Sequence, residues 1–491
     1  MEITLIGYVL IPLGLILAVV APISVLLYML IFFSSFTATA IINVSSPSFG
    51  LQPGYYFGLL FMARFGVEFL LKGVDSCHRV QAVVLSPLWY FCIVAFLSII
   101  VIPFYGPVYV HRPSGETVLL KLSGENFTQF VYLVYVIALT TSIALCKPTP
   151  KEMNKCLKVF IFSGLFVVFW GWMQVVMYYL KIPYPEYLFN NSISFSQNYE
   201  QFMAAIGLKR MNSVAPEPSM MARFLLIPTF MSFYCAYNRN FLFKYRNSII
   251  LTPLFSITLI CTTSATAAAG FLGGLFIFYF FVTIIIPKAR AKGRGVLGTD
   301  RTMKPLVIVL LLLFVAGSIL FSIAVWRLGF SVDRLVTFTN LVLLDKLETQ
   351  SGQGRLDAAL SGLELFVSHP ILGIGWGSNR TFDITTNMLS ATGGIGTVLF
   401  ACVHLILAWY AIQLIRSRLR HTHPLIPSYV EILLLALGVR VFGKMLSEPG
   451  ITFIDHWILV GLTVASLGWV KWVPSRSEGE QQQQESRLLA C

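Results

Sequence analysis

Thirteen long apolar blocks, separated by polar stretches, dominate the sequence of this 491-residue chain. Most are roughly 18 to 24 residues long, enough for a helix to cross about 30 Å of hydrocarbon. Only 12% of the residues carry charge and the mean hydropathy is +0.77, which excludes an ordinary soluble globule. The sequence therefore predicts an all-α polytopic membrane protein. The blocks are 3–20, 22–43, 55–71, 87–105, 127–146, 158–180, 219–237, 248–265, 267–287, 305–326, 394–415, 428–446 and 452–470.

The first two blocks are separated only by Ala21 and Pro22. They form either a tight hairpin or one long helix with a proline kink, so 13 or 12 membrane helices are expected. The side on which Met1 lies depends on this choice. No basic region or cleavage-site pattern accompanies the first block, so we expect it to be retained as a membrane segment.

The net charge of +13 is distributed unevenly between the two sets of polar segments. One set holds 21 of the 35 Lys and Arg residues against six acidic residues, a net +15, whereas the other holds ten basic and eleven acidic residues, a net −1. The positive-inside rule places the first set in the cytoplasm, so the charge indicates membrane orientation and no nucleic-acid partner is expected. The first set is 72–79, 147–158, 238–247, 288–304, 416–423 and 471–491; the second is 106–127, 181–218 and 327–390.

Two large loops, 181–218 and 327–390, are thus predicted on the outer face. Long loops in compact proteins are usually functional. Residues 1–470 are expected to form one transmembrane domain, and 471–491, which contain a glutamine run, a disordered cytoplasmic tail. The eight cysteines include no Cys-x-x-Cys pair, so neither a zinc site nor a disulfide framework is predicted, and no metal or cofactor is expected.

The first outer loop ends in a helix-start motif beside arginines. Pro218 suits the first position of a helix, and Glu217 lies where its charge interacts favourably with the helix dipole. The motif could serve only to start the helix. However, Arg210 and Arg223 stand close to it, and an arginine at the membrane face needs an anionic partner, either Glu217 or a ligand phosphate.

The second outer loop combines an arginine, an amphipathic stretch and a glycine cluster. The apolar spacing over 356–367 predicts a helix along the membrane surface with Arg355 at its start. His369, before Pro370, is typical of a residue that ends a helix, with catalysis as the alternative. The cluster Gly373-x-Gly375-x-Gly377 allows tight turns and close approach of the backbone to a ligand.

Taken together, these motifs resemble the bacterial O-antigen polymerase and ligase superfamily. The resemblance rests on Arg-x(6)-Glu-Pro-Ser before a membrane helix, Gly-Arg and His-Pro-Ile-Leu-Gly-x-Gly in the second loop, and Thr386-Asn387-Met388-Leu389 before the next helix. It implies a GT-C-like membrane fold and transfer, without a metal ion, of glycans carried on undecaprenyl pyrophosphate at the periplasmic face of the bacterial inner membrane. Expected partners are that lipid-linked glycan, membrane lipids, a chain-length regulator and a flippase.

The resemblance also implies roles for individual residues. Arg210 and Arg355 would clamp the pyrophosphate leaving group, and Glu217 or a histidine would accept the acceptor's proton. Inversion at the anomeric carbon is the expected stereochemistry. Further substrate contacts are expected from Arg223, Arg380, Asn387, His369, Arg440, Lys444, Tyr184 and Tyr187.

One departure distinguishes two members of the superfamily. Ligases have a histidine just before the asparagine of the last motif, but here that position is Thr386, before Asn387. This favours a Wzy-type polymerase, which joins repeat units, over a ligase, which transfers the glycan to lipid A core. A transporter or flippase for lipid-linked glycans is the alternative of another class, although no internal repeat is evident.

Two pairs of these residues have structural alternatives. Arg440 and Lys444 share a helix face and could contact an anionic lipid or phosphate, or form a pair with Glu448. Tyr184 and Tyr187 could stack on sugars or belong to an interfacial aromatic belt.

Overall fold

The computed structural model describes residues 1–45, 48–72, 79–111, 117–194, 202–203, 208–238, 241–286, 350–416, 425–448 and 450–469. Among these residues, eight helices are long and apolar enough to cross a membrane, and four apolar helices are shorter. The eight are α3 (Pro53–Lys72), α4 (Arg79–Ile100), α5 (Gly124–Cys146), α6 (Pro150–Leu180), α8 (Pro218–Tyr237), α10 (Ala265–Phe280), α15 (Ile384–Arg416) and α16 (Leu425–Ser447). The four are α1 (Leu5–Val20), α2 (Ile23–Phe33), α9 (Tyr245–Cys261) and α17 (Ile454–Leu467). The chain is therefore of the helical, multi-pass membrane type that the apolar blocks predict.

Short elements complete the architecture. The 3₁₀ helix η1 (Ile102–Phe104) follows α4, and the π-helical turn η2 (Phe281–Ile285) continues α10. The loops predicted to lie outside contain α7 (Glu186–Phe189) and α14 (Gln350–Ser368). Of the thirteen predicted blocks, 305–326 lies outside the described residues; each of the other twelve overlaps one of the twelve apolar helices.

The α1 and α2 segments form a hairpin, not one kinked helix. Glu2 pairs with Asn43 in a small sheet, and the Thr4 amide donates to the Ile41 carbonyl over 3.1 Å. The beginning of α1 and the chain that follows α2 consequently lie together, with the turn at Ala21 and Pro22 at the other end. This settles the alternative that the sequence leaves open and places the first residues beside the segment 38–45.

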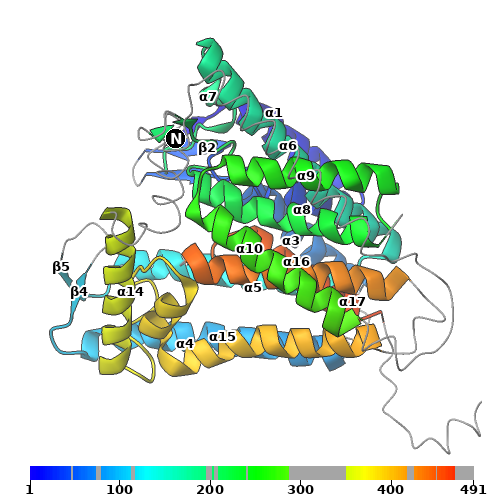
Figure 1. Cartoon of the computed structure of the whole chain (residues 1–491). Helices are drawn as coiled ribbons and strands as arrows, with labels where there is room; N and C mark the ends of the chain where they lie inside the picture. The colour runs from blue at the N-terminus through cyan, green and yellow to red at the C-terminus, as the bar shows by residue number, and fades with distance from the viewer. Residues whose placement is uncertain are drawn as a thin grey trace, which may run out of the picture.

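Helix ends gather in two groups, as Figure 1 shows for the long, roughly aligned helices. At one end, the Trp469 indole donates to the Pro148 carbonyl over 2.9 Å and Gln81 donates to the Ala144 carbonyl over 3.1 Å. At the opposite end, the Ala38 amide donates to the Val214 carbonyl and the Ser192 amide to the Ala38 carbonyl. The second group contains the described parts of the loops predicted to lie outside, and we refer to it as the loop end.

Short strands at the loop end depart from the all-α prediction. They form three small antiparallel sheets, in which extended loop segments pair their backbone N–H and C=O groups. The register includes Ile42 opposite Leu51, Val110 opposite Val118, and Phe202 opposite Lys209. The strands are β1 (Glu2–Ile3), β2 (Ile42–Val44), β3 (Phe49–Leu51), β4 (Tyr109–His111), β5 (Thr117–Leu119), β6 (Phe202–Met203) and β7 (Leu208–Lys209).

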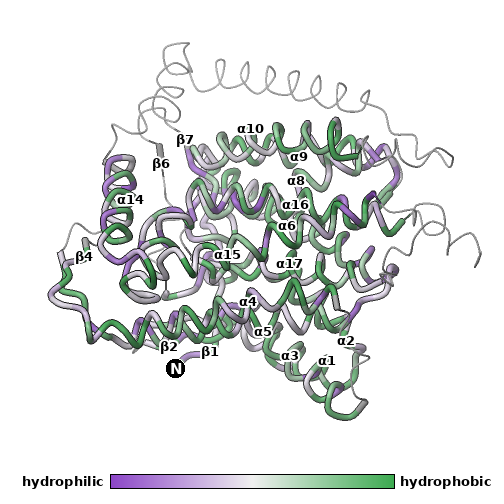
Figure 2. Tube along the Cα trace, turned by 90° about the horizontal axis from the view of Figure 1, so that it is seen from below, coloured by the Kyte–Doolittle hydropathy of each residue, from purple (hydrophilic) through white to green (hydrophobic). Residues whose placement is uncertain are grey.

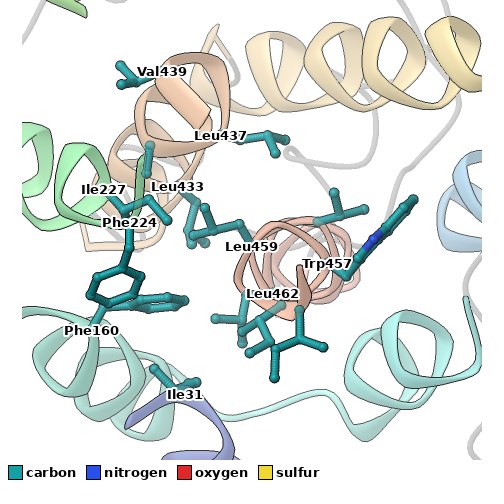
Figure 3. Packing of buried hydrophobic residues seen from close by; sticks show 14 of the residues in the cluster. Ile31, Phe160, Phe224, Ile227, Leu433, Leu437, Val439, Trp457, Leu459 and Leu462 are labelled. Carbon is teal, nitrogen blue, oxygen red and sulfur yellow. The ribbon is translucent and has the colours of Figure 1, made fainter. Parts of the chain in front are cut away.

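Helix α17 lies at the centre of the bundle, and all 14 of its residues are buried. Figure 3 shows Trp457, Leu459 and Leu462 pointing from it toward different surrounding helices. Helix α8 is also almost wholly buried. Other membrane helices expose apolar side chains, such as Leu405 on α15 at 68% exposure, as expected of surfaces that face lipid. The tube in Figure 2 is correspondingly mostly hydrophobic along these helices.

Helix α14 runs across the loop end, at a steep angle to the long helices (Figure 1). It packs mainly against the beginning of α15 and against β4. Leu365 is buried on one face whereas Leu356 and Leu363 are 46% and 40% exposed, so its apolar face is only partly covered by protein. The helix itself is thus confirmed, and its position along a membrane surface stays a prediction.

Candidate functional site

Glu217 lies at the N-terminus of α8 as its sequence context predicts. It is the residue that precedes the first helical position, which Pro218 occupies. Its carboxylate makes no capping hydrogen bond to the helix backbone, but accepts one from the Ser219 hydroxyl over 3.0 Å. Glu217 is exposed, so its carboxylate is accessible from the loop end.

Two arginines from different loops lie near this carboxylate. Arg210 comes from the strand segment before α8, and Arg355 comes from α14. Burial lowers the pKa of each guanidinium, and the negative charge of Glu217 opposes that shift at both. Arg210 and Arg355 therefore both lie within electrostatic range of Glu217 at the loop end, although the two arginines are separated by more than a hundred positions in sequence. We refer to these three residues as the arginine trio.

Neighbouring groups position each arginine. A guanidinium nitrogen of Arg210 donates to the Thr263 carbonyl, which lies just before α10, over 3.5 Å. Arg355 lies over the ring of Phe382 at 5.2 Å, a cation–π arrangement that holds a planar guanidinium without neutralising it. Both side chains are half-buried, so they are partly shielded from water but are not sealed in the core.

The predicted start of the loop helix at Arg355 was wrong by more than a turn. Helix α14 begins at Gln350 and includes Gly352 and Gly354. Glycine lowers helix stability by only about 1 kcal/mol, a cost that packing of the helix can offset. Arg355 consequently projects from the second turn of the helix and not from its end.

The glycine cluster of the second loop packs against the beginning of α15. Gly373 and Gly393 both have positive φ angles, of 68° and 64°. A Cβ on Gly393 would lie 2.3 Å from the Ile371 carbonyl oxygen, and a Cβ on Gly373 would lie 2.4 Å from the Ser390 carbonyl oxygen. These glycines are explained by the close approach of two backbone segments, so a ligand is not needed to account for them.

Arg223, Arg440 and Lys444 are brought together, but inside the bundle and with carboxylate partners. Arg440 donates to Glu448 over 2.6 Å and to Asp455 over 2.6 and 3.2 Å. Arg223 lies 3.5 Å from Glu448 and donates to the Ser447 carbonyl over 2.9 Å. The ammonium group of Lys444 pairs with Glu448 and donates to the Gly450 carbonyl over 2.9 Å.

This buried ion cluster answers the question raised by the sequence about these three cations. The partner of Arg223 is Glu448, which was not foreseen, whereas the pairing of Lys444 with Glu448 was one of the two alternatives. The five side chains are all at most 5% exposed. Because charges in such a place need close counter-charges, the geometry accounts for the cluster structurally.

A cavity of about 410 Å³ opens at the loop end, separate from the arginine pair. Arg380 and Asn387 line it, so two of the predicted substrate residues share this cavity. Sequence reasoning missed its other polar and aromatic groups, because they come from segments far apart in the chain. They include Gln52, Tyr55, Glu125, Gln129, Tyr132 and Trp376.

The remaining predicted residues lie in local contacts. His369 is in edge-to-face contact with Tyr105 at 4.5 Å, and its Nδ1 is 3.0 Å from the Ser368 hydroxyl. Tyr184 donates to Asn190 over 2.9 Å and lies against Trp170, whereas Tyr187 is 63% exposed. Burial raises the pKa of Tyr184.

Thr386, at the position of the ligase histidine, belongs to the cap of α15. Its backbone amide donates to one carboxylate oxygen of Asp383 over 2.8 Å, and its hydroxyl donates to the other over 2.5 Å. Asp383 thereby satisfies an amide at the beginning of the helix, as a capping carboxylate does.

Neither a protein-family model nor a curated protein matches this sequence. Within the described ranges, no group of three or more His, Cys, Asp or Glu side chains is arranged to hold a metal ion. The site is therefore characterised by its own arrangement: two guanidinium groups within electrostatic range of an exposed carboxylate, and a cavity at the same end of a helical membrane protein.

Proposed function

We propose that this protein is a glycosyltransferase of the bacterial inner membrane, with a GT-C-like fold and its active face in the periplasm. It polymerises oligosaccharide repeat units carried on undecaprenyl pyrophosphate into an O-antigen or exopolysaccharide. The observation that carries the proposal is that Arg210 and Arg355, held on two separate loops by Thr263 and Phe382, both lie within electrostatic range of the exposed carboxylate of Glu217. The motif resemblance supplies the substrate class.

The chemistry of the three side chains suits this reaction. Glycosyl transfer from a pyrophosphate breaks the bond between the anomeric carbon and a phosphate oxygen, which leaves negative charge on the departing undecaprenyl pyrophosphate. Two guanidinium groups can stabilise that charge by charge-assisted hydrogen bonds. The acceptor hydroxyl forms the new glycosidic bond with inversion and gives its proton to the Glu217 carboxylate, which acts as general base.

The multi-pass architecture supports a lipid-linked substrate. A donor with a polyprenyl tail must remain in the membrane while its pyrophosphate and sugars reach the loop end, which is where the trio lies. A polymerase is favoured over a ligase because Thr386 takes the place of the ligase histidine and its hydroxyl is engaged by Asp383.

The test is reconstitution of the purified protein in liposomes with repeat units linked to undecaprenyl pyrophosphate. The expected product is a ladder of polymers, separated by gel electrophoresis, without any added lipid A core. Product that forms only when lipid A core is present would replace the polymerase with a ligase. Movement of the intact substrate across the membrane with no new glycosidic bond would replace it with a transporter.

Variants connect the activity to the trio. Arg210→Ala and Arg355→Ala should each abolish the ladder, because one guanidinium alone cannot neutralise the leaving group. Arg246→Ala is the matched control, since Arg246 is an exposed arginine at the beginning of α9, at the other end of the bundle. A full ladder from either loop-end variant would refute the assignment of the arginines.

A further inference from the structure

The cavity at the loop end lies between elements that the arginine trio does not use. Its walls come from the beginning of α3, the beginning of α5, the segment 376–380 and the segment 450–452. Its volume of about 410 Å³ falls within the range of roughly 300–1,000 Å³ that is usual for small-molecule sites. A polymerase that joins two lipid-linked glycans needs a place for each of them.

We infer that this cavity binds sugar residues of the acceptor glycan, whereas the arginine trio holds the pyrophosphate of the donor. The inference rests on the proposed function and adds a second, chemically different subsite to it.

The aromatic part of the lining suits the apolar faces of sugar rings. Tyr55, on α3, lies against both Tyr132 and Tyr135 of α5, with ring centroids 5.5 and 5.0 Å apart. Two of the three hydroxyls donate hydrogen bonds to the backbone: Tyr55 to the Thr452 carbonyl, and Tyr135 to the Tyr55 carbonyl over 3.1 Å. The cluster is thereby held in place, which keeps the entropic cost of binding low.

The polar part of the lining suits hydroxyl groups and not phosphate. Gln129 and Asn387 offer amide donors and acceptors, as hydroxyl-rich ligands require. Glu125 and Arg380 contribute one negative and one positive charge, so these two side chains add no net charge to the cavity. The trio, in contrast, has two positive charges against one negative charge. The pyrophosphate is therefore attracted to the trio, and the cavity suits a neutral oligosaccharide.

The rim of the cavity allows the acceptor to keep its lipid in the membrane. Leu59 on α3 and Val131 on α5 line the cavity and are 47% and 66% exposed. Exposed apolar side chains on membrane helices are the surface that lipid covers. A glycan in the cavity can thus remain attached to a prenyl chain that passes between these two residues.

One segment connects the two subsites. Arg380 and Asn387 line the cavity, and Phe382, between them in sequence, lies beneath the guanidinium of Arg355. The Thr381 amide donates to the Asn387 side chain over 3.4 Å, which holds this turn together. Acceptor sugars in the cavity would therefore be presented beside the arginine that binds the donor.

Direct binding is the first test. The probe is the neutral repeat-unit oligosaccharide on an octyl chain, titrated calorimetrically into the full-length protein in lipid nanodiscs, and inorganic pyrophosphate is titrated separately. Gln129→Ala and Tyr132→Leu should each weaken binding of the octyl glycoside about tenfold, the loss expected for one hydrogen bond or one stacking contact. Both variants should bind pyrophosphate as the wild type does.

Matched controls come from the same helix. Thr128 is exposed outside the cavity and its hydroxyl donates to the Gly124 carbonyl of its own helix over 3.0 Å, and Phe127 is 48% exposed. Thr128→Ala and Phe127→Leu should leave binding of the octyl glycoside unchanged. Equal binding by wild type and cavity variants, or no binding by the wild type, would overturn the inference.

Kinetics separate this inference from the proposed function. With the octyl glycoside as acceptor and a fixed lipid-linked donor, the cavity variants should raise the acceptor KM about tenfold and leave kcat unchanged. Polymerisation without this change in the acceptor KM would refute the acceptor subsite and leave the proposed polymerase activity unaffected. Specific binding of the octyl glycoside by a protein that makes no polymer refutes the polymerase and retains the sugar site.

Discussion

The guanidinium of Arg440 and the carboxylate of Glu448 lie 2.6 Å apart inside the bundle. A second carboxylate, that of Asp455, pairs with another nitrogen of the same guanidinium. The cluster joins the end of α16 to the beginning of α17 and, through Arg223, to α8. It lies beneath the loop end, so it holds together the helices from which the candidate site projects.

Removal of one member of this cluster should destabilise the protein strongly. Arg440→Met leaves Glu448 and Asp455 without their main counter-charge in a buried place, a loss of about 3–5 kcal/mol of unfolding free energy. The measurement is the thermal unfolding midpoint of the purified protein in detergent. The control is Arg64→Met, since Arg64 pairs with Glu68 over 3.0 Å but both are about a third exposed, and such a pair contributes only about 0–1 kcal/mol. Equal midpoints for the two variants would contradict the role of the cluster.

Gly393 should not tolerate any side chain. Its φ of 64° and ψ of −164° lie in a region that only glycine adopts readily, and a Cβ would collide with the Ile371 carbonyl oxygen. Gly393→Ala should lower the unfolding free energy by about 1–3 kcal/mol from backbone strain, and further through the steric contact. Gly66→Ala is the control, because nothing lies within 4 Å of a Cβ there and alanine favours a helix. A variant at Gly393 as stable as the wild type would show that the turn is not strained by a side chain.

Asn126 should hold the second loop against α5. It is fully buried, and its amide donates to the Trp376 carbonyl over 2.7 Å and to the Ser378 hydroxyl over 2.8 Å. Asn126→Ala leaves the buried carbonyl without its donor, which costs about 1–3 kcal/mol locally. Hydrogen exchange should accelerate about tenfold or more over 373–380 and remain unchanged in α6. Thr128→Ala, two residues further along the same helix and exposed, should leave exchange in the loop at the wild-type rate.

Glu217 should affect turnover and not binding of the donor. Glu217→Gln keeps the shape of the side chain but removes the base, so kcat should fall about 100-fold or more while the donor KM changes little. The measurement is the initial rate of polymer formation in liposomes. Glu364→Gln, at an exposed position on α14, should retain the wild-type rate. Unchanged kcat in the Glu217 variant would assign the proton transfer to another group.

Much of the fold follows from one-dimensional patterns. The helices are local structures whose apolar length is visible in the sequence, and the helix start at Glu217 and Pro218 depends only on neighbouring residues. Arg210 and Arg355 stand in loops assigned to the same face, so the sequence predicts that they lie on the same side of the protein. That both lie near Glu217 depends on tertiary packing.

Other features depend on packing that a sequence does not display. Nothing local indicates that Glu448, and not Glu217, is the closest carboxylate to Arg223. The cavity was missed for the same reason, because Tyr55, Gln129 and Thr452 belong to three distant segments. The sequence also does not show which partner each glycine of the cluster meets: Gly373 lies against the backbone near Gly393, whereas Gly377 lies against α5 and lines the cavity.

The burial of α17 has a consequence for how the protein is assembled. At 14 residues the helix is about 21 Å long, shorter than the hydrocarbon layer of about 30 Å. Its first turn contains the polar residues Asp455 and His456. Such a segment is poorly suited to partition into lipid by itself. We therefore expect α17 to be inserted late, into a space already formed by α5 and α16, with Arg440 neutralising Asp455 as it enters. Truncation before Ile454 would then leave the other helices in the membrane around an unfilled centre.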